Sequence, residues 1–257
     1  MLGRLDWETS SRVVERDRQI EGSVVVIARP GPDGVLADIY AAGRENAYFE
    51  VVGWAVRFAR AAGASIVHVT AGKGHGAELK ELGLRAVRPW WRMDRSLSGD
   101  LPDVSPVPGY ELVDGTGVAE GTWEETFNRS FADHWRFVTR TEGEIVRGKS
   151  PELCLMAVTA PGRRPAAITL CEVEEYLADS RPQPVGLVGS VGTVPEHRRR
   201  GLAGWLVAGA LPRLRGAGAR HASLYVDGLN ATRAYDVYRK LGFEVAYEAE
   251  VWEATSP

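Results

Sequence analysis

The chain has 257 residues, of which 44% are hydrophobic and 25% charged, and its formal net charge is −3. This balance is typical of a globular protein and excludes a disordered tail or a generally basic nucleic-acid binder. The two cysteines, Cys154 and Cys171, form no zinc or disulfide pattern. No apolar run approaches the roughly 18 residues of a membrane span, and the first residues contain no leader-type apolar segment. We therefore expect a cytoplasmic protein that binds no metal, nucleic acid or membrane.

Residues 1–97 are expected to form a first domain. A strand hairpin is predicted at 12–15 and 20–28, around a turn at Asp17 and Arg18. The following segments predict a helix and a strand within 53–69, then a short helix and a strand within 78–93.

Residues 98–108, SGDLPDVSPVP, are rich in Pro, Gly, Ser and Asp and predict a linker. A second domain over 109–257 follows. Its helices are predicted from about Thr122, over 142–146, from near Arg199, and over 231–240, the last capped by Asn230 and stopped by Gly242. Its strands are predicted at 110–113, 153–159, 166–173, 185–194, 222–226 and 244–253. Strands that first form hairpins and then alternate with helices predict an α/β fold with a mixed (α+β) sheet.

The two domains repeat one pattern. GWAVRFARAAGASIVHV at 53–69 corresponds to GWLVAGALPRLRGAGARHASLYV at 204–226, and ELKELGLRAVRPWWRM at 78–93 corresponds to VYRKLGFEVAYEAEVW at 237–252. Each half thus has a helix, a strand, a short helix ending in Leu-Gly and a last strand. The first half has no counterpart of the two leading helices of the second, so either it is naturally truncated or its beginning lies upstream in the native gene.

The segment PEHRRRGLAG, at 195–204, places three arginines before small residues at the expected start of a helix. A helix N-terminus has unpaired N–H groups and a partial positive charge, which together bind anions. Gly201, Ala203 and Gly204 would let a phosphate approach the backbone, and the arginines would add charge around it. This pattern favours a diphosphate site, although a basic surface turn before a core helix would use the same residues.

The surrounding motifs resemble the GCN5-related N-acetyltransferase (GNAT) superfamily. Arg198-x-x-Gly201-x-Ala203 follows a predicted strand, and Asn230-x-x-x-Ala234 is followed by Tyr238-x-x-x-Gly242-Phe243. The resemblance is specific over 185–253. With the repeat, the whole chain resembles tandem GNAT proteins, which include mycothiol synthases, so two tandem GNAT-like domains are expected, the first of them degenerate.

The resemblance implies an acyl-CoA-dependent N-acetyltransferase that moves an acetyl group from acetyl-CoA to a small-molecule amine by direct attack in a ternary complex. It implies that pantetheine pairs with the backbone of Val191, Gly192 and Thr193. It also places the diphosphate on the loop and helix start that comprise Arg198, Arg199, Arg200, Gly201, Leu202, Ala203 and Gly204. Asn230 matches the residue that contacts pantetheine. Tyr238 matches the acid that protonates the leaving thiolate, with Tyr235 as the other acid candidate; packing alone would also explain Tyr238.

The general base stays open. The strand VGLVGSVGTV contains no acid, whereas the mycothiol synthase pattern implies a Glu near the position of Gly189. Acidic or basic side chains elsewhere are the remaining candidates: Glu172, Glu174, Asp133, His134 and Asp227.

The first domain lacks the corresponding motifs. Aligning Gly53-Trp54 with Gly204-Trp205 puts Ala47, Glu50 and Val52 at the positions of Arg198, Gly201 and Ala203. A carboxylate and a branched side chain oppose a diphosphate there, and Leu79 replaces Tyr238. We expect this half to shape the acceptor site or to stabilise the pair.

Three alternatives to a general amine acetyltransferase are considered. The chain could be a catalytically silent acyl-CoA sensor, because the predicted strand lacks a carboxylate. It could be a mycothiol synthase-like enzyme. Nucleic-acid binding through Arg198–Arg200 is opposed by the net charge. A monomer or homodimer is expected in each case.

Overall fold

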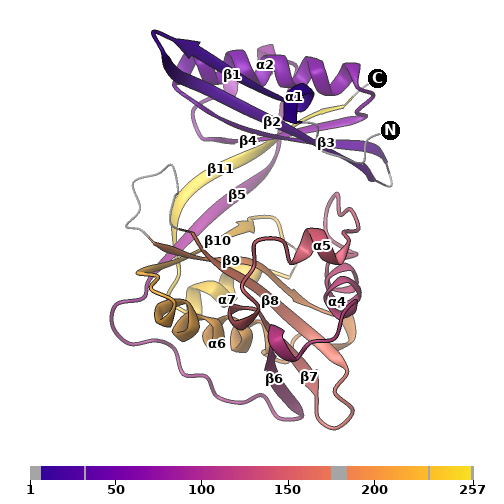
Figure 1. The fold of residues 1–257 in the computed structure, drawn as a ribbon, viewed down its shortest axis with the longest axis vertical. Coiled ribbons are helices and arrows are strands. Elements are labelled where there is room, and N and C mark those ends of the chain that lie inside the picture. The colour runs from indigo at the N-terminus through magenta and orange to yellow at the C-terminus, as the bar shows by residue number, and fades with distance from the viewer. Residues whose placement is uncertain (1–6, 32, 175–183, 231, 256–257) are drawn as a thin grey trace. The chain divides into compact units, whose positions relative to one another are not determined.

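In the computed structural model, residues 7–31, 33–174, 184–230 and 232–255 are described. They contain seven α-helices and eleven strands (Figure 1). The helices are α1 (Trp7–Ser10), α2 (Glu45–Ala61), α3 (Gly76–Glu81), α4 (Thr122–Phe131), α5 (Glu142–Ile145), α6 (Leu202–Gly216) and α7 (Ala234–Lys240). The strands are β1 (Ser11–Arg16), β2 (Gln19–Gly31), β3 (Gly34–Gly43), β4 (Ile66–Gly72), β5 (Arg85–Ser96), β6 (Tyr110–Asp114), β7 (Leu155–Thr159), β8 (Pro165–Glu174), β9 (Val185–Thr193), β10 (His221–Asp227) and β11 (Glu244–Thr255).

The chain divides into two compact units, and each contains one part of an 11-stranded mixed sheet. Unit 1 holds the described residues up to Trp91, with Asp227–Leu229 and those from Tyr247 onward, and unit 2 holds the rest. Neighbouring strands follow the order β1-β2-β3-β4-β11-β5 in unit 1 and β5-β10-β9-β8-β7-β6 in unit 2. The predicted α/β fold with mixed sheets is confirmed.

The last strand of the chain, β11, belongs to unit 1 from Tyr247 onward. Residues 249–255 of β11 pair antiparallel with β4, from Ala249 opposite Gly72 to Thr255 opposite Ile66. The expected domains, 1–97 and 109–257 joined by 98–108, differ from this division because they assign the last strand to the second half. These boundaries, which follow the internal sequence repeat, stay a prediction.

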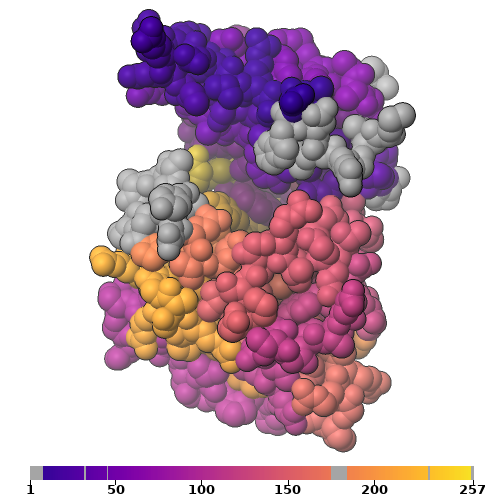
Figure 2. Space-filling model, in the orientation of Figure 1, coloured from indigo at the N-terminus to yellow at the C-terminus, as the bar shows by residue number. Residues whose placement is uncertain are grey.

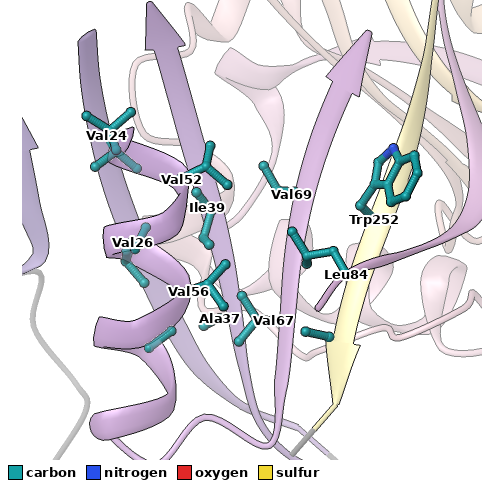
Figure 3. Packing of buried hydrophobic residues seen from close by; sticks show 14 of the residues in the cluster. Val24, Val26, Ala37, Ile39, Val52, Val56, Val67, Val69, Leu84 and Trp252 are labelled. Carbon is teal, nitrogen blue, oxygen red and sulfur yellow. The ribbon is translucent and has the colours of Figure 1, made fainter. Parts of the chain in front are cut away.

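The core of unit 1 forms where one amphipathic helix, α2, packs on one face of the sheet. Small and β-branched residues recur along α2 at helical spacing and are buried: Ala47, Val51, Val52, Ala55, Val56 and Ala59. They pack against alternate residues of β2, β3 and β4, and Trp252 from β11 joins them (Figure 3). The predicted first hairpin is confirmed: β1 and β2 pair antiparallel, and Asp17 and Arg18 form its turn with positive φ. The strand β3 was not predicted, because the small residues of LADIYAAG weaken its alternation.

Unit 2 packs helices on both faces of its sheet. Aromatic and aliphatic side chains of α4, α5, β7 and β8 form a core on one face: Trp123, Phe127, Ile145, Cys154, Met156, Val158, Ile168 and Leu170. The helix α6 packs against β7, β8 and β9, and its Leu206, Leu211 and Leu214 are fully buried. Figure 2 shows the segment from α4 to α5, in magenta to pink, at the surface of unit 2. The sheet of unit 2 is therefore covered on both sides, which leaves the strand edges to supply a site.

Candidate acyl-CoA site

The parallel strands β9 and β10 separate midway along their length. Their pairing runs from Val185 opposite His221 to Val188 opposite Leu224 and continues no further. The next residue, Gly189, is the extra residue of a bulge, because Leu170 pairs with Ser190 while Cys171 pairs with Val188. Beyond the bulge, β9 keeps β8 as its partner on one edge only. The other edge, over residues 189–193, has no strand partner among the described residues, so it can accept an extended ligand.

The predicted pantetheine residues lie on this edge. Val191, Gly192 and Thr193 pair with Thr169, Ile168 and Ala167 of β8. Gly192 is required by close packing, because a Cβ there would lie 2.7 Å from Ser130 Cβ and 2.8 Å from Phe131 Cε2 on α4. The side chains of α4 therefore press directly on the strand whose free edge is the candidate site.

Arg198 holds the loop after β9 in place. Its Nη1 and Nη2 bind the two carboxylate oxygens of Asp133 at 2.5 and 2.8 Å. Nη2 also donates to Ser130 O and Nε to Thr193 O, at 3.0 and 3.1 Å. The guanidinium lowers the pKa of Asp133 below its usual value. Through these hydrogen bonds, Arg198 connects the end of α4 to the end of β9. The sequence did not indicate this role.

The start of α6 is a series of open backbone amides. Arg199 and Gly201 both have positive φ, 61° and 87°, and Gly201 is the N-cap. The helix therefore begins at Leu202, not near Arg199 as predicted, because two left-handed residues cannot continue an α-helix. The first intrahelical bond is Trp205 N to Gly201 O. Within the described residues, the N–H groups of Leu202, Ala203 and Gly204 have no hydrogen-bond partner, and a Cβ at Gly201 would meet open space. Arg199 and Arg200 flank this opening with exposed side chains.

The helix α7 places Tyr238 next to α6. A Cβ on Gly204 of α6 would lie 3.5 Å from Val237 of α7, so Gly204 faces the side chain of Val237. Tyr238 is 7% exposed and contacts Phe243 edge to face, with ring centroids 6.3 Å apart. Burial raises the pKa of the Tyr238 phenol, which keeps it protonated at neutral pH. Tyr235 is half-buried, between the guanidinium groups of Arg233 and Arg239.

Asn230 does not cap α7. Ala231, the predicted first helical residue, lies outside the described residues, and the helix begins at Ala234 with Arg233 as its N-cap. The Asn230 carboxamide oxygen instead accepts from the N–H and hydroxyl of Thr232, at 2.8 and 2.5 Å. Such a local turn competes with helix formation, which explains the later start.

The candidate bases occupy different environments. Asp133 is bound to Arg198, and the His134 ring packs on Phe131 with centroids 4.8 Å apart. Asp227 lies in unit 1, where it pairs with Arg88 at 3.2 Å. These contacts oppose a role of Asp133 or Asp227 as a free base.

Glu172 lies nearer the bulge. It forms an ion pair with Lys149, a residue that the sequence did not single out. Glu174, two residues along β8, is half-buried. We found no group of three or more His, Cys, Asp or Glu side chains in the described ranges that could hold a metal ion. In the same ranges, no helix has the length and apolar character needed to cross a membrane.

In unit 1, two parallel strands also stop pairing midway, but no counterpart of the loop between β9 and α6 follows. Its parallel strands β3 and β4 pair only from Leu36–Ile66 to Ile39–Val69. A cavity of about 410 Å³ lies beyond this point, lined by residues that include Tyr48, His75 and Tyr247. However, α2 starts at Glu45, directly after β3, with Arg44 as its N-cap. The N–H groups of Ala47 and Tyr48 donate to Arg44 O, so the third amide of α2 is bonded, whereas the third amide of α6, at Gly204, is open. The start of α2 therefore leaves fewer amides open than the start of α6.

Comparisons with known proteins agree with this arrangement. The family described as FR47-like protein matches residues 168–253, which include β9, the loop, α6 and α7. Mycothiol acetyltransferase from Nocardia farcinica is 30% identical over 257 residues, which cover 92% of this chain and 82% of that protein. The chain therefore belongs to the GCN5-related N-acetyltransferase superfamily, as its motifs predicted.

Within that superfamily, the chain is similar to the mycothiol acetyltransferases. The relative from Thermobispora bispora is 31% identical over 179 residues, and the chain spans 55% of its length. A solved tandem GNAT protein from the clavulanic acid biosynthesis pathway has 18% identity and a TM-score of 0.64, and the match covers 96% of this chain and 84% of that one. This last similarity concerns the fold, and it agrees with the predicted tandem organisation.

Proposed function

We propose that the chain is an acyl-CoA-dependent N-acetyltransferase that transfers an acetyl group from acetyl-CoA to a small-molecule amine. One observation carries the proposal: the free edge of β9 leads through a single loop to the open amides of α6. An extended thioester and a diphosphate are the two chemical groups that such neighbouring features would bind together.

Each part of the site has a proposed role. Val191, Gly192 and Thr193 offer backbone groups to the pantetheine. The amides of Gly201–Gly204 hold the diphosphate, and Arg199 and Arg200 add positive charge. Arg198 contributes by fixing the loop through Asp133, rather than by contact. Asn230 and Tyr235 lie at the start of α7, where they can line the cofactor path. Because these groups belong to unit 2, and α2 replaces the loop in unit 1, we expect one acetyl-CoA per chain.

The reaction needs one acid and one proton acceptor. The amine nitrogen attacks the thioester carbonyl carbon, a C–N bond forms, and the C–S bond breaks. Tyr238 supplies a proton to the departing sulfur, since its phenol is protonated at neutral pH. The attacking ammonium loses two protons in total; one leaves to solvent through a base, and the other restores the phenol. The products are an amide, CoA thiol and one released proton.

Two experiments test the proposal. Calorimetry should show binding of acetyl-CoA at about one molecule per chain. Thiol release with a panel of amines should fall by about 10²-fold or more in Tyr238→Phe, the range of general acid catalysis, while acetyl-CoA affinity changes little. A wild type that does not bind acetyl-CoA would refute the proposal.

Two other functions make different predictions in the same experiments. A silent acyl-CoA sensor, suggested by the strand β9 without a carboxylate, would bind acetyl-CoA and release no thiol with any amine. Mycothiol acetyltransferase activity is suggested by the similar proteins of that name. Gly189 leaves β9 without the Glu that the mycothiol synthase pattern implies, so we give this acceptor second place.

A further inference from the structure

Lys149 and Glu172 form a largely buried ion pair beside the strand bulge. Lys149 Nζ donates to Glu172 Oε1, and the two side chains are only 17% and 20% exposed. Lys149 comes from the loop after α5, and Glu172 from β8. A Cβ at Gly189 would lie 3.9 Å from Lys149 Cε and 4.0 Å from Nζ. Gly189, the bulge residue, therefore lies next to the ammonium group of Lys149.

The pair keeps unused hydrogen-bonding capacity. An ammonium has three N–H groups and a carboxylate about four lone-pair sites. In the described part of the chain, the ammonium donates to Glu172 only, and Glu172 Oε2 accepts no hydrogen bond. Burial of such a pair removes the two charges from water, which costs free energy. The protein would be about as stable with an apolar pair of similar size in their place. Stability therefore gives a weak reason for these two residues, and binding gives a stronger one.

The pair is also close to the point where acyl transfer is proposed to occur. Glu172 pairs with Leu187, and Leu187 pairs with Ser223, so the three form one row across β8, β9 and β10. The β9–β10 pairing ends one residue after this row. Tyr225, two residues beyond Ser223 and thus on the same sheet face, is half exposed at the opening. The row spans two strand spacings, roughly 10 Å, from Glu172 to Ser223, and the free edge of β9 begins at Gly189, two residues beyond Leu187.

We propose that Lys149 and Glu172 recognise an acceptor that carries a carboxylate next to its amine, as an α-amino acid does. This inference rests on the proposed acetyltransferase function. The acceptor carboxylate binds the remaining N–H groups of Lys149, and the acceptor ammonium binds Glu172 Oε2. Each charge of the acceptor thus contacts a side chain of opposite charge. Glu172 then takes one ammonium proton and passes it to solvent, which leaves the amine lone pair free to attack the thioester carbon.

The test uses matched acceptors with the whole chain and saturating acetyl-CoA. Thiol release is measured for several α-amino acids and for the corresponding amino acid amides, which keep the amine and lose the carboxylate charge. We expect kcat/KM to be at least about 30-fold higher for the acids, as for a desolvated charge-assisted contact. Lys149→Met should lower this ratio to about one. Glu172→Gln should lower kcat with both acceptors by about tenfold or more, because the amide cannot take the ammonium proton.

Lys73→Met is the matched control. It removes the lysine of another Lys–Glu pair, Lys73 with Glu248, which is exposed and lies in unit 1. It should leave the acid-to-amide ratio unchanged. Because a single change leaves one buried charge unpaired, the double variant Lys149→Met/Glu172→Met is measured as well. Acetyl-CoA calorimetry establishes that each variant is folded.

The outcomes separate this inference from the proposed function. Acetyl-CoA binding, with turnover that favours the amides or with no turnover of any amino acid, overturns the acceptor inference alone. The same holds if Lys149→Met lowers kcat/KM equally for acids and amides. Failure of the wild type to bind acetyl-CoA overturns both.

Discussion

A carboxylate at the N-cap of α6 should expel the diphosphate, and Gly201→Glu tests this. Gly201 has a φ of 87° and open space at its Cβ position, so a glutamate fits without collision at the cost of backbone strain. A non-glycine residue in this conformation costs roughly 1–2 kcal/mol of stability. The new charge would lie roughly 6 Å from a diphosphate with two negative charges, which gives a repulsion of about 1.4 kcal/mol in water and about 5.5 kcal/mol at an effective dielectric constant of 20. Acetyl-CoA affinity should therefore fall at least about tenfold.

Gly218→Glu is a close control for strain and charge. Gly218 follows the C-terminus of the same helix, has a φ of 95°, and likewise has open space at its Cβ. Calorimetry should show acetyl-CoA affinity near the wild-type value for this variant. Gly201→Ala adds the strain without the charge, so its difference from Gly201→Glu isolates the electrostatic part. If Gly201→Glu binds acetyl-CoA within threefold of Gly218→Glu, the diphosphate does not lie at the start of α6.

Two further predictions concern the framework of the site. Gly192→Ala should destabilise unit 2 by about 1–3 kcal/mol, because its methyl group would lie 2.7 Å from a side chain of α4. Thermal unfolding measures this loss. Gly189→Ala is the milder change, because the nearest atom to its methyl group would be 3.4 Å away. Equal losses would contradict the packing argument. Asp133→Asn should cost roughly 0.5–1 kcal/mol at pH 7, since the Asp133 side chain is 57% exposed. The folded pKa of Asp133 lies below the ordinary 3.8, so this loss should shrink as the pH falls through and below that value; a loss that is constant from pH 7 to 3 would refute it.

Much of unit 2 could be predicted because its signals are local. The strands β8 to β10 are apolar runs with clear turn signals, and the strand predicted at 185–194 is β9 at 185–193. Helix starts were predicted less well. Both α6 and α7 begin three residues later than predicted, because Arg199 and Arg233 take left-handed conformations that are rare for arginine. A sequence motif marks such a loop but does not show its backbone angles.

The contacts that the sequence did not reveal are long-range. Arg198 meets Asp133 across 65 residues of chain, and Lys149 meets Glu172 across 23. The pairing of β11 with β4 is likewise between distant segments: the strand has the expected residues, and its partner, Ile66–Gly72, lies far earlier in the chain. Neither a motif nor a hydrophobic period carries information about a partner so distant in the chain.

The two halves show how little separates a possible cofactor site from a closed one. Both contain a parallel strand pair that separates midway, and both continue into a helix with a Gly-Trp pair, at Gly53 and Gly204. In unit 2, eight residues lie between β9 and α6, and they form the loop that leads to the open amides of α6. In unit 1, Arg44 alone connects β3 to α2, and the residues aligned with the loop are helical, so Ala47 is buried and its amide is bonded. Without the loop, α2 starts directly after β3, and the N–H group of Ala47 is bonded inside the helix and is not offered to an anion.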